Sequence, residues 1–223
     1  MKNYSIAIDG PAGAGKSTIA KDISEQLSFI YVDTGAMYRA MALYVLRKNI
    51  SPDNIEEIAL VYNEVDISLD YINNEQQIYL NGENVSNIIR SEEVGNAAST
   101  ISKHLIIREK MVELQQNIAA NTNVVMDGRD IGTVVLPNAD LKIYLTASAE
   151  ERAKRRYLDL KIRGIDGDIE EIKADIISRD KQDMTRENSP LKEADDAIKI
   201  DSSEMSIEEV VGEILSLFEK SKM

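Results

Sequence analysis

The first residues that could do chemistry are Gly10-Pro11-Ala12-Gly13-Ala14-Gly15-Lys16-Ser17, which match the pattern G-x-x-x-x-G-K-[ST]. Glycines let the backbone wrap closely around phosphates, so that amide N–H groups and the N-terminus of the following helix face negative oxygens. Lys16 can reach the β- and γ-phosphates, and the Ser17 hydroxyl can bind Mg²⁺. An apolar run precedes the motif and an amphipathic stretch follows it, as a phosphate-binding loop requires. The motif predicts that a nucleoside triphosphate binds here.

Arginines are the second group of residues that could take part in chemistry. Seven of the 11 arginines lie between Arg129 and Arg186. A kinase must neutralise the charge of a donor and an acceptor phosphate together and must exclude water. Arg152 and Arg156 are four residues apart and share a helix face, where one could stack on adenine while the other reaches the triphosphate. Ordinary ion pairs on helix surfaces are the alternative.

The overall composition excludes several classes of protein. The net charge of −13 repels nucleic acid, so no polymeric DNA or RNA partner is expected. No apolar run approaches the ~20 residues of a membrane helix, and no signal peptide is evident. The chain has no cysteine, which is typical of a reducing compartment and predicts a cytoplasmic protein. No heptad pattern or long apolar stripe demands a partner, so a monomer is expected.

Three classes of P-loop protein compete at this point. A regulatory GTPase would carry Asn-Lys-x-Asp and Asp-x-x-Gly strings, and neither occurs. A mechanical ATPase needs an acidic residue that closes an apolar strand, and Val124-Val125-Met126-Asp127 could supply it. The small size, the acidic charge and the arginines favour a small-molecule kinase. A P-loop ATPase, or a kinase acting on a different small acceptor, remains the alternative.

Strands and helices alternate in a way that predicts an α/β fold with a parallel P-loop core. The predicted strands are Tyr4 to Asp9, Phe29 to Asp33, Val124 to Asp127, Leu141 to Leu145 and Ala197 to Asp201. Helices are expected after the P-loop, at about 36–48, 91–120, 148–164 and 168–183, and from Ser206 onward. The whole chain, residues 1–223, is expected to be a single domain.

Two segments depart from this core. Residues of about 63–90 are predicted to form a small antiparallel insert, because apolar and polar residues alternate strictly from Val65 to Tyr71. Turn signals stand at Asn73-Asn74 and Asn81-Gly82. Residues of about 152–186, which carry most of the arginines, are expected to form a helical lid.

Several segments resemble bacterial cytidylate kinases, a family of nucleoside-monophosphate kinases. They are Gly10 to Ser17, Asp33-Thr34-Gly35-Ala36-Met37-Tyr38-Arg39, Asp127-Gly128-Arg129-Asp130-Ile131-Gly132-Thr133-Val134-Val135, Glu150-Glu151-Arg152 and Ser189-Pro190-Leu191. The resemblance runs over nearly the whole chain and includes the insert. It implies transfer of the γ-phosphate of ATP to CMP or dCMP, with Mg²⁺.

The resemblance also implies roles for single residues. The residues from Gly10 to Thr18, with Arg152 and Arg156, are expected to bind ATP, and Ser17 is expected to bind Mg²⁺. Thr34, Arg39 and Arg129 would hold the acceptor phosphate, Ser99, Arg108 and Asp130 would face the cytosine, and Arg179 and Asp183 would approach the sugar. Lys16, Arg129, Arg179 and Arg186 are the expected catalytic residues. Salt bridges within this acidic chain are the alternative role for the arginines.

Overall fold

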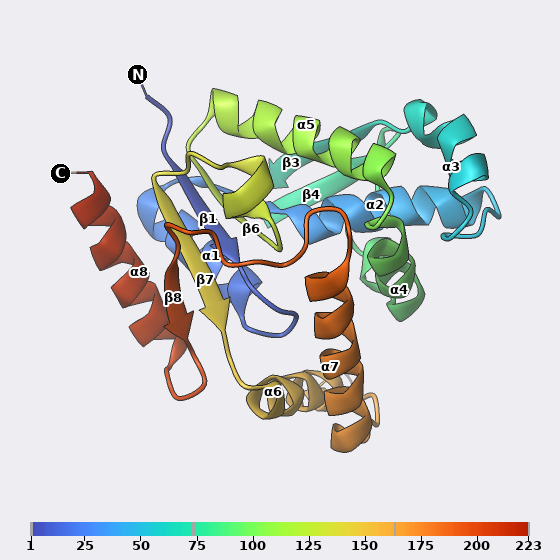
Figure 1. Ribbon diagram of the computed structural model, residues 1–223. Helices are drawn as coiled ribbons and strands as arrows, with labels where there is room; N and C mark the ends of the chain where they lie inside the picture. The colour runs from blue at the N-terminus through green and yellow to red at the C-terminus, as the bar shows by residue number, and fades with distance from the viewer. Residues whose placement is uncertain (1, 73–74, 163, 223) are drawn as a thin grey trace. The chain divides into compact units, whose positions relative to one another are not determined.

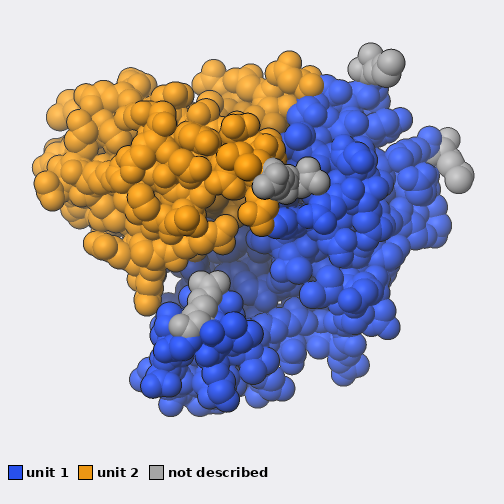
Figure 2. All heavy atoms as spheres, turned by 180° about the vertical axis from the view of Figure 1, so that it is seen from behind, with its two compact units in different colours: residues 1–31, 122–223 blue, residues 32–121 orange. Residues whose placement is uncertain are grey.

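The structure is a computed structural model that describes residues 2–72, 75–162 and 164–222. The chain divides into two compact units, which Figure 2 shows in different colours. Unit 1 consists of residues 1–31 and 122–223, and unit 2 of residues 32–121. Each unit is described by itself. That residues 1–223 act as a single domain stays a prediction.

Unit 1 contains the predicted parallel sheet, and the α/β fold class is confirmed. Its strand order is β2-β6-β1-β7-β8. The strands are β1 (Ser5–Asp9), β2 (Ile30–Asp33, whose last two residues are counted in unit 2), β6 (Val124–Gly128), β7 (Leu141–Thr146) and β8 (Ile198–Asp201). Strands β1, β6 and β7 are almost wholly buried, which explains their unbroken apolar runs. The register pairs Asp9 with Gly128 on β6 and with Tyr144 on β7, so these strands end together.

The helices of unit 1 are α1 (Lys16–Leu27), α6 (Ala149–Ile162), α7 (Ile169–Thr185) and α8 (Ile207–Ser221). Helices α1 and α8 contact each other. They bury Ile23, Ile214 and Phe218 in the core of the sheet. A capping box between Ser206 and Glu209 starts α8, as predicted. Helix α6 follows β7, and α7 packs against α6 (Figure 1). The predicted lid segment therefore coincides with a pair of packed helices.

Unit 2 contains the predicted antiparallel insert. Strands β3 (Ile67–Ile72), β4 (Glu75–Leu80) and β5 (Glu83–Asn84) form a three-stranded sheet in that order. The predicted turn at Asn81-Gly82 has positive φ at both residues, which a tight hairpin favours. The other predicted turn, at Asn73-Asn74, lies outside the described residues.

The helices of unit 2 differ from the expectation at two points. They are α2 (Thr34–Arg47), α3 (Ile55–Val61), α4 (Glu92–Ile101) and α5 (Leu105–Asn121), with short 3-10 turns η1 (Tyr62–Glu64) and η2 (Ile88–Arg90). Helix α3 was not predicted. The long helix expected at 91–120 is wrong, because Ser102, Lys103 and His104 separate α4 from α5. His104 Nε2 hydrogen-bonds Pro52 O at 2.8 Å, and the backbone oxygen of His104 accepts the amides that start α5. The apolar period continues across this break and therefore conceals it.

None of the helices, over the residues that the structure describes, is both long and apolar enough to cross a membrane.

Gly10 lets the P-loop leave β1 beside β7. Its φ is 150°, a conformation that L-residues rarely adopt, and a Cβ there would collide with the carbonyl oxygen of Leu145. The first glycine of the motif is therefore required by backbone packing as well as by phosphate binding.

We predict that Gly10→Ala lowers the thermal midpoint strongly and abolishes ATP binding, because the loop must move away from β7. Gly212→Ala is the matched control: Gly212 lies in α8 with open space where its Cβ would stand, so alanine should stabilise the helix by up to about 1 kcal/mol. Thermal denaturation and ATP titration measure both effects. A Gly10→Ala protein with the parental midpoint and ATP affinity would contradict this role.

Candidate active site

The P-loop closes around the amino group of Lys16. Gly13 and Gly15 have φ values of 77° and 88°, and Gly15 is the N-cap of α1. Lys16 is buried, and its Nζ donates a hydrogen bond to Pro11 O at 2.8 Å. Burial, followed by the charge of Arg129, lowers the pKa of Lys16 to about 7 against the opposing effect of nearby carboxylates. A bound anion would favour the charged form of this lysine, so the loop suits a phosphate.

Asp127 lies next to the P-loop at the end of β6. Ser17 Oγ donates to Asp127 Oδ2 at 2.9 Å, and the hydroxyl of Tyr31 donates to Asp127 Oδ1 at 2.9 Å. From the sequence, the only role considered for Asp127 was that of the acidic strand-end residue of a mechanical ATPase. In the structure, Asp127 is hydrogen-bonded to Ser17, the predicted Mg²⁺ ligand. Hydroxyl and carboxylate oxygens are ligands that Mg²⁺ accepts, so this pair fits the ion.

The small number of oxygens that Ser17 and Asp127 provide also fits Mg²⁺. Within residues 2–72, 75–162 and 164–222, no group of three or more His, Cys, Asp or Glu side chains could hold a metal. Mg²⁺ usually needs only one or two protein oxygens, because substrate phosphates and water complete its shell. Ser17 and Asp127 offer oxygens of that number and kind.

Five predicted site residues lie in unit 1, four of them for the acceptor and the fifth the catalytic Arg186. Arg129 Nε donates to Asp183 Oδ2 on α7 at 2.8 Å. Arg186 Nη2 lies 3.8 Å from Asp130 Oδ1, and both side chains are buried. Arg179 is one turn before Asp183 on α7 and so shares its helix face. The structure thus gathers alternating positive and negative groups around the end of β6.

Arg152 braces the P-loop. This buried side chain donates Nε to Ala147 O at 2.9 Å, Nη1 to Ala12 O at 2.9 Å and Nη2 to Asp180 Oδ2 at 2.6 Å. All three guanidinium nitrogens therefore have protein acceptors, one of them in the P-loop itself.

The second arginine that lies against the P-loop is Arg155. Its Nη2 donates to Ser202 O at 2.7 Å, and its Nη1 lies 3.7 Å from the position of a Cβ on Gly15. Arg156, the predicted ATP ligand, is exposed and pairs with Asp159 at 3.2 Å. Spacings of three and four both return to the face of Arg152, so the sequence could not choose between Arg155 and Arg156. An ATP contact by Arg156 stays a prediction.

The remaining predicted acceptor residues lie in unit 2. Thr34 is buried at the start of α2, which Asp33 caps by accepting the amide of Ala36 at 2.9 Å. Arg39 donates to Ile89 O at 3.1 Å, and a Cβ on Gly95 of α4 would lie 3.1 Å from Arg39 Nη1. Helix α4 can approach this arginine so closely because it carries a glycine there.

Arg108 is held at the break between α4 and α5. It is 2% exposed, donates to Ser102 O at 3.0 Å and lies 5.6 Å from the ring centroid of Tyr38. Ser99, on α4, accepts the Ser102 hydroxyl with its backbone oxygen at 2.9 Å. A chain of hydrogen bonds thus links Arg108, Ser102 and Ser99 at the helix break in unit 2.

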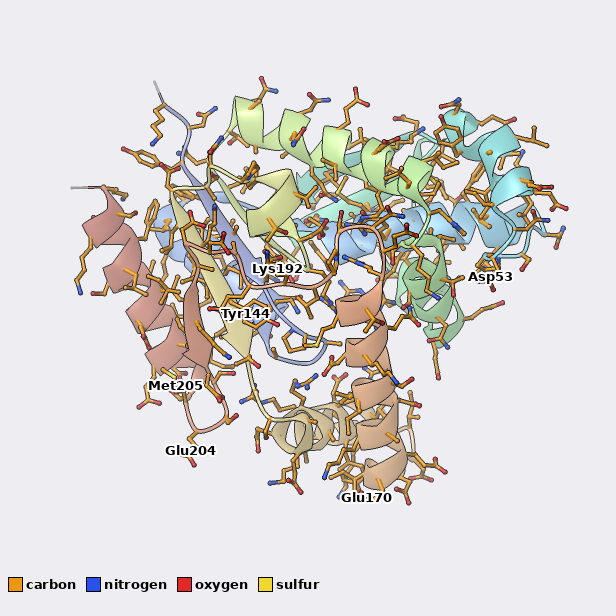
Figure 3. All side chains as sticks on the ribbon, in the orientation of Figure 1. Asp53, Tyr144, Glu170, Lys192, Glu204 and Met205 are labelled. Atoms are coloured by element: carbon orange, nitrogen blue, oxygen red, sulfur yellow. The ribbon has the colours of Figure 1, made fainter. Side chains whose placement is uncertain are left out.

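Two further residues were missed in the sequence. Gln76 on β4 accepts the amide of Asp33 at 2.8 Å, which ties the antiparallel insert to the start of α2. Asp9, at the end of β1, accepts two backbone amides of the segment that follows Asp130. Tyr144, labelled in Figure 3, is the register partner of Asp9 on β7. Burial, followed by the charges of Glu193, Asp180 and Asp9, raises the pKa of Tyr144. A long sequence separation hides each of these contacts.

We predict that Asp180→Ala destabilises the protein by about 3–5 kcal/mol, because it leaves the charge of Arg152 buried without its carboxylate. Asp159→Ala removes the exposed partner of Arg156 and should change the free energy of unfolding by less than about 1 kcal/mol. Urea denaturation of the nucleotide-free proteins compares the two. Equal, small losses would show that Asp180 does not hold Arg152.

Comparison with known proteins agrees with the chemistry of these residues. A family model described as cytidylate kinase matches residues 6–220. The chain is 54% identical over 220 residues to a cytidylate kinase of Caldicellulosiruptor bescii, covering 99% of this chain and 97% of that protein. It is 50% identical over 216 residues to a cytidylate kinase of Bacillus cytotoxicus, covering 97% and 96%. Among solved structures, a gluconokinase from Sinorhizobium meliloti is similar in fold, with a TM-score of 0.51, 11% identity and coverage of 97% and 92%.

Proposed function

Because the chain belongs to the cytidylate kinase family, we propose that it transfers the γ-phosphate of ATP to CMP or dCMP. The products are ADP and CDP or dCDP. The observation that carries this proposal is the meeting of the P-loop with Arg129, Asp130, Asp183 and Arg186 at the ends of β1 and β6. A donor phosphate and an acceptor phosphate both need cationic side chains that are held in place, and the paired Arg129 and Arg186 meet that need.

The transfer needs no general base. The second pKa of a phosphate monoester is near 6, so the attacking oxygen of CMP is already mostly ionised at pH 7. This oxygen forms a bond to the γ-phosphorus while the bond to the β-phosphate oxygen breaks, and ADP leaves with that electron pair. Catalysis then consists of alignment and neutralisation of charge. His104 is consistent with this mechanism, because its ring is engaged by Pro52 O.

The donor side is assigned to the P-loop. The backbone from Gly10 to Thr18 cradles the phosphates, and Lys16 releases Pro11 O to bind the γ-phosphate. Ser17, with Asp127, holds Mg²⁺, which neutralises charge on the donor phosphates when it is bound. Arg152 keeps the loop in shape, and Arg155 lies beside it as a further candidate for the nucleotide.

The acceptor side is assigned from the resemblance to cytidylate kinases. Thr34, Arg39 and Arg129 bind the phosphate of CMP, and Arg179 and Asp183 bind the sugar. Ser99, Arg108 and Asp130 face the cytosine, and Arg186 approaches the phosphates as the segment 152–186 closes. That this segment is a lid, and that the enzyme acts as a monomer in the cytoplasm, stay predictions from the sequence.

The cytosine assignment has a chemical basis. Cytosine offers an amino donor beside two acceptors, so an Asp can accept from its amino group while an Arg donates to its acceptors. Uracil reverses the first two polarities and would leave buried partners unsatisfied. Sites of this kind reject the wrong partner strongly.

We predict that CMP and dCMP are phosphorylated with a kcat/KM roughly 10⁴ times that of UMP. The measurement is ADP release from ATP and Mg²⁺ with a panel of nucleoside monophosphates. Omitting the acceptor should leave only slow hydrolysis of ATP. Equal turnover of UMP and CMP would remove the assignment of the base-facing residues, and stimulation by a nucleic acid polymer instead would favour the ATPase alternative.

We predict that Lys16→Ala lowers kcat by at least about 10²-fold, because the charge that meets the γ-phosphate in the transition state is lost. Circular dichroism and thermal denaturation should show an intact fold, since the buried amino group contributes no apolar packing. Lys21→Ala, on the same helix, is the control and should keep the parental kcat. A folded Lys16→Ala enzyme with near-normal turnover would refute the role of Lys16.

A further inference from the structure

Asp9 makes two short hydrogen bonds across the sheet. Its Oδ1 accepts the amide of Ile131 at 2.8 Å, and its Oδ2 accepts the amide of Gly132 at 2.7 Å. These amides open the π-helical turn η3 (Ile131–Val135), which follows Arg129 and Asp130. Asp9 is 5% exposed. A buried carboxylate from β1 therefore binds the first two amides of a turn that is more than 100 residues away in sequence.

The first amides of a helical turn have no acceptor within the turn and normally bind the side chain of their own N-cap residue. Here the N-cap is Asp130, a residue type well suited to capping, yet its side chain makes no capping hydrogen bond in this part of the described chain. Its carboxylate lies instead 3.8 Å from Arg186 Nη2. Asp9 has taken over the capping that Asp130 would ordinarily perform.

We propose that Asp9 is a positioning residue, which caps η3 in place of Asp130 and so leaves the Asp130 carboxylate to face the acceptor base. This inference rests on the proposed function for the role of Asp130 alone. The capping itself is a property of the fold and can be measured without substrate.

Gly132 supports this assignment independently. A Cβ at Gly132 would lie 3.4 Å from Asp9 Oδ2 and 3.1 Å from Lys142 Cδ. The φ of Gly132 is not positive, so the backbone conformation does not require a glycine there. Glycine is needed at this position because it lets the Asp9 carboxylate and the aliphatic part of Lys142 lie close to the turn.

Several charged or titratable groups surround Asp9. Asp130 faces it from the loop after β6, Lys16 from α1, Tyr144 from β7 and Lys142 from beside Gly132. Burial raises the pKa of Asp9 to about 6, although the two amides and Lys16 act in the opposite direction. Asp9 is thus ionised and able to cap at pH 7.5. Below pH 6 it gains a proton, which turns one acceptor oxygen into a donor that faces an amide.

The test is Asp9→Asn, which keeps the shape but places an NH₂ group against one of the two amides. We expect the KM for CMP to rise about tenfold and the preference for CMP over UMP to fall, with a smaller change in the KM for ATP. As the pH falls from 7.5 to 5.5, the KM for CMP should rise more steeply in the parent than in the variant. The phosphate of CMP also titrates near 6, but it does so equally in both proteins.

Amide hydrogen exchange, followed by NMR without substrate, is the readout of capping. At least one of the amides of Ile131 and Gly132 should exchange about tenfold faster in Asp9→Asn. The matched control is Asp140→Asn, because the Asp140 carboxylate likewise accepts a backbone amide, that of Ser5 at 2.9 Å, at the other end of β1. It should leave exchange at 131 and 132, the KM for CMP and the pH profile unchanged.

Unchanged exchange and unchanged KM for CMP in a folded Asp9→Asn enzyme would overturn the proposal. If that variant does not fold, Gly132→Ala decides instead, because it keeps Asp9 but crowds its carboxylate and should raise the KM for CMP in the same way. A parent enzyme without preference for CMP would sink the assignment of Asp130 to the base, and the exchange measurement would still decide whether Asp9 caps the turn.

Discussion

The parallel pairing of β1 with β6 is the constraint on which the rest of unit 1 depends. Its register sets Asp9 opposite Gly128, so the P-loop and the segment that begins at Arg129 leave the sheet at the same level. Parallel strands with helical crossovers place their carboxyl ends at one edge, where ligands of open α/β sheets bind. The backbone thus brings the P-loop and Arg129 to the same edge of the sheet.

This edge concentrates buried charge in an acidic protein. The side chains of Lys16, Arg152 and Arg186 are buried, and each lies near a carboxylate or a backbone oxygen. Charges that are taken out of water must be paired, since an isolated buried ion is strongly unfavourable. These pairs keep the cations in place. An anionic substrate that binds can then replace a protein oxygen as the hydrogen-bond acceptor of a cation. The net charge of −13 therefore says little about the local surroundings of the site.

The sequence predicted the features that are encoded locally. The P-loop depends on eight consecutive residues, and the insert depends on strict alternation over one strand, so both could be recognised. Contacts that depend on the assembled sheet could not be. Asp9 binds a turn across the sheet, and Ser17 of α1 binds Asp127 of β6. The break at Ser102 was concealed because the apolar residues of α4 and α5 continue one helical period. Arg155 and Arg156 could not be distinguished, since both lie within one turn of Arg152.

The hydrogen bond from the Asp33 amide to the Gln76 side chain joins the three-stranded sheet to the start of α2. A change in the length or slope of β4 would be transmitted to the first turn of α2 and hence to Thr34 and Arg39. Homologues that differ in this hairpin should therefore also differ at the residue that meets the amide of Asp33. An experiment that exchanges this region between kinases of the family should therefore move residues 32–121 together.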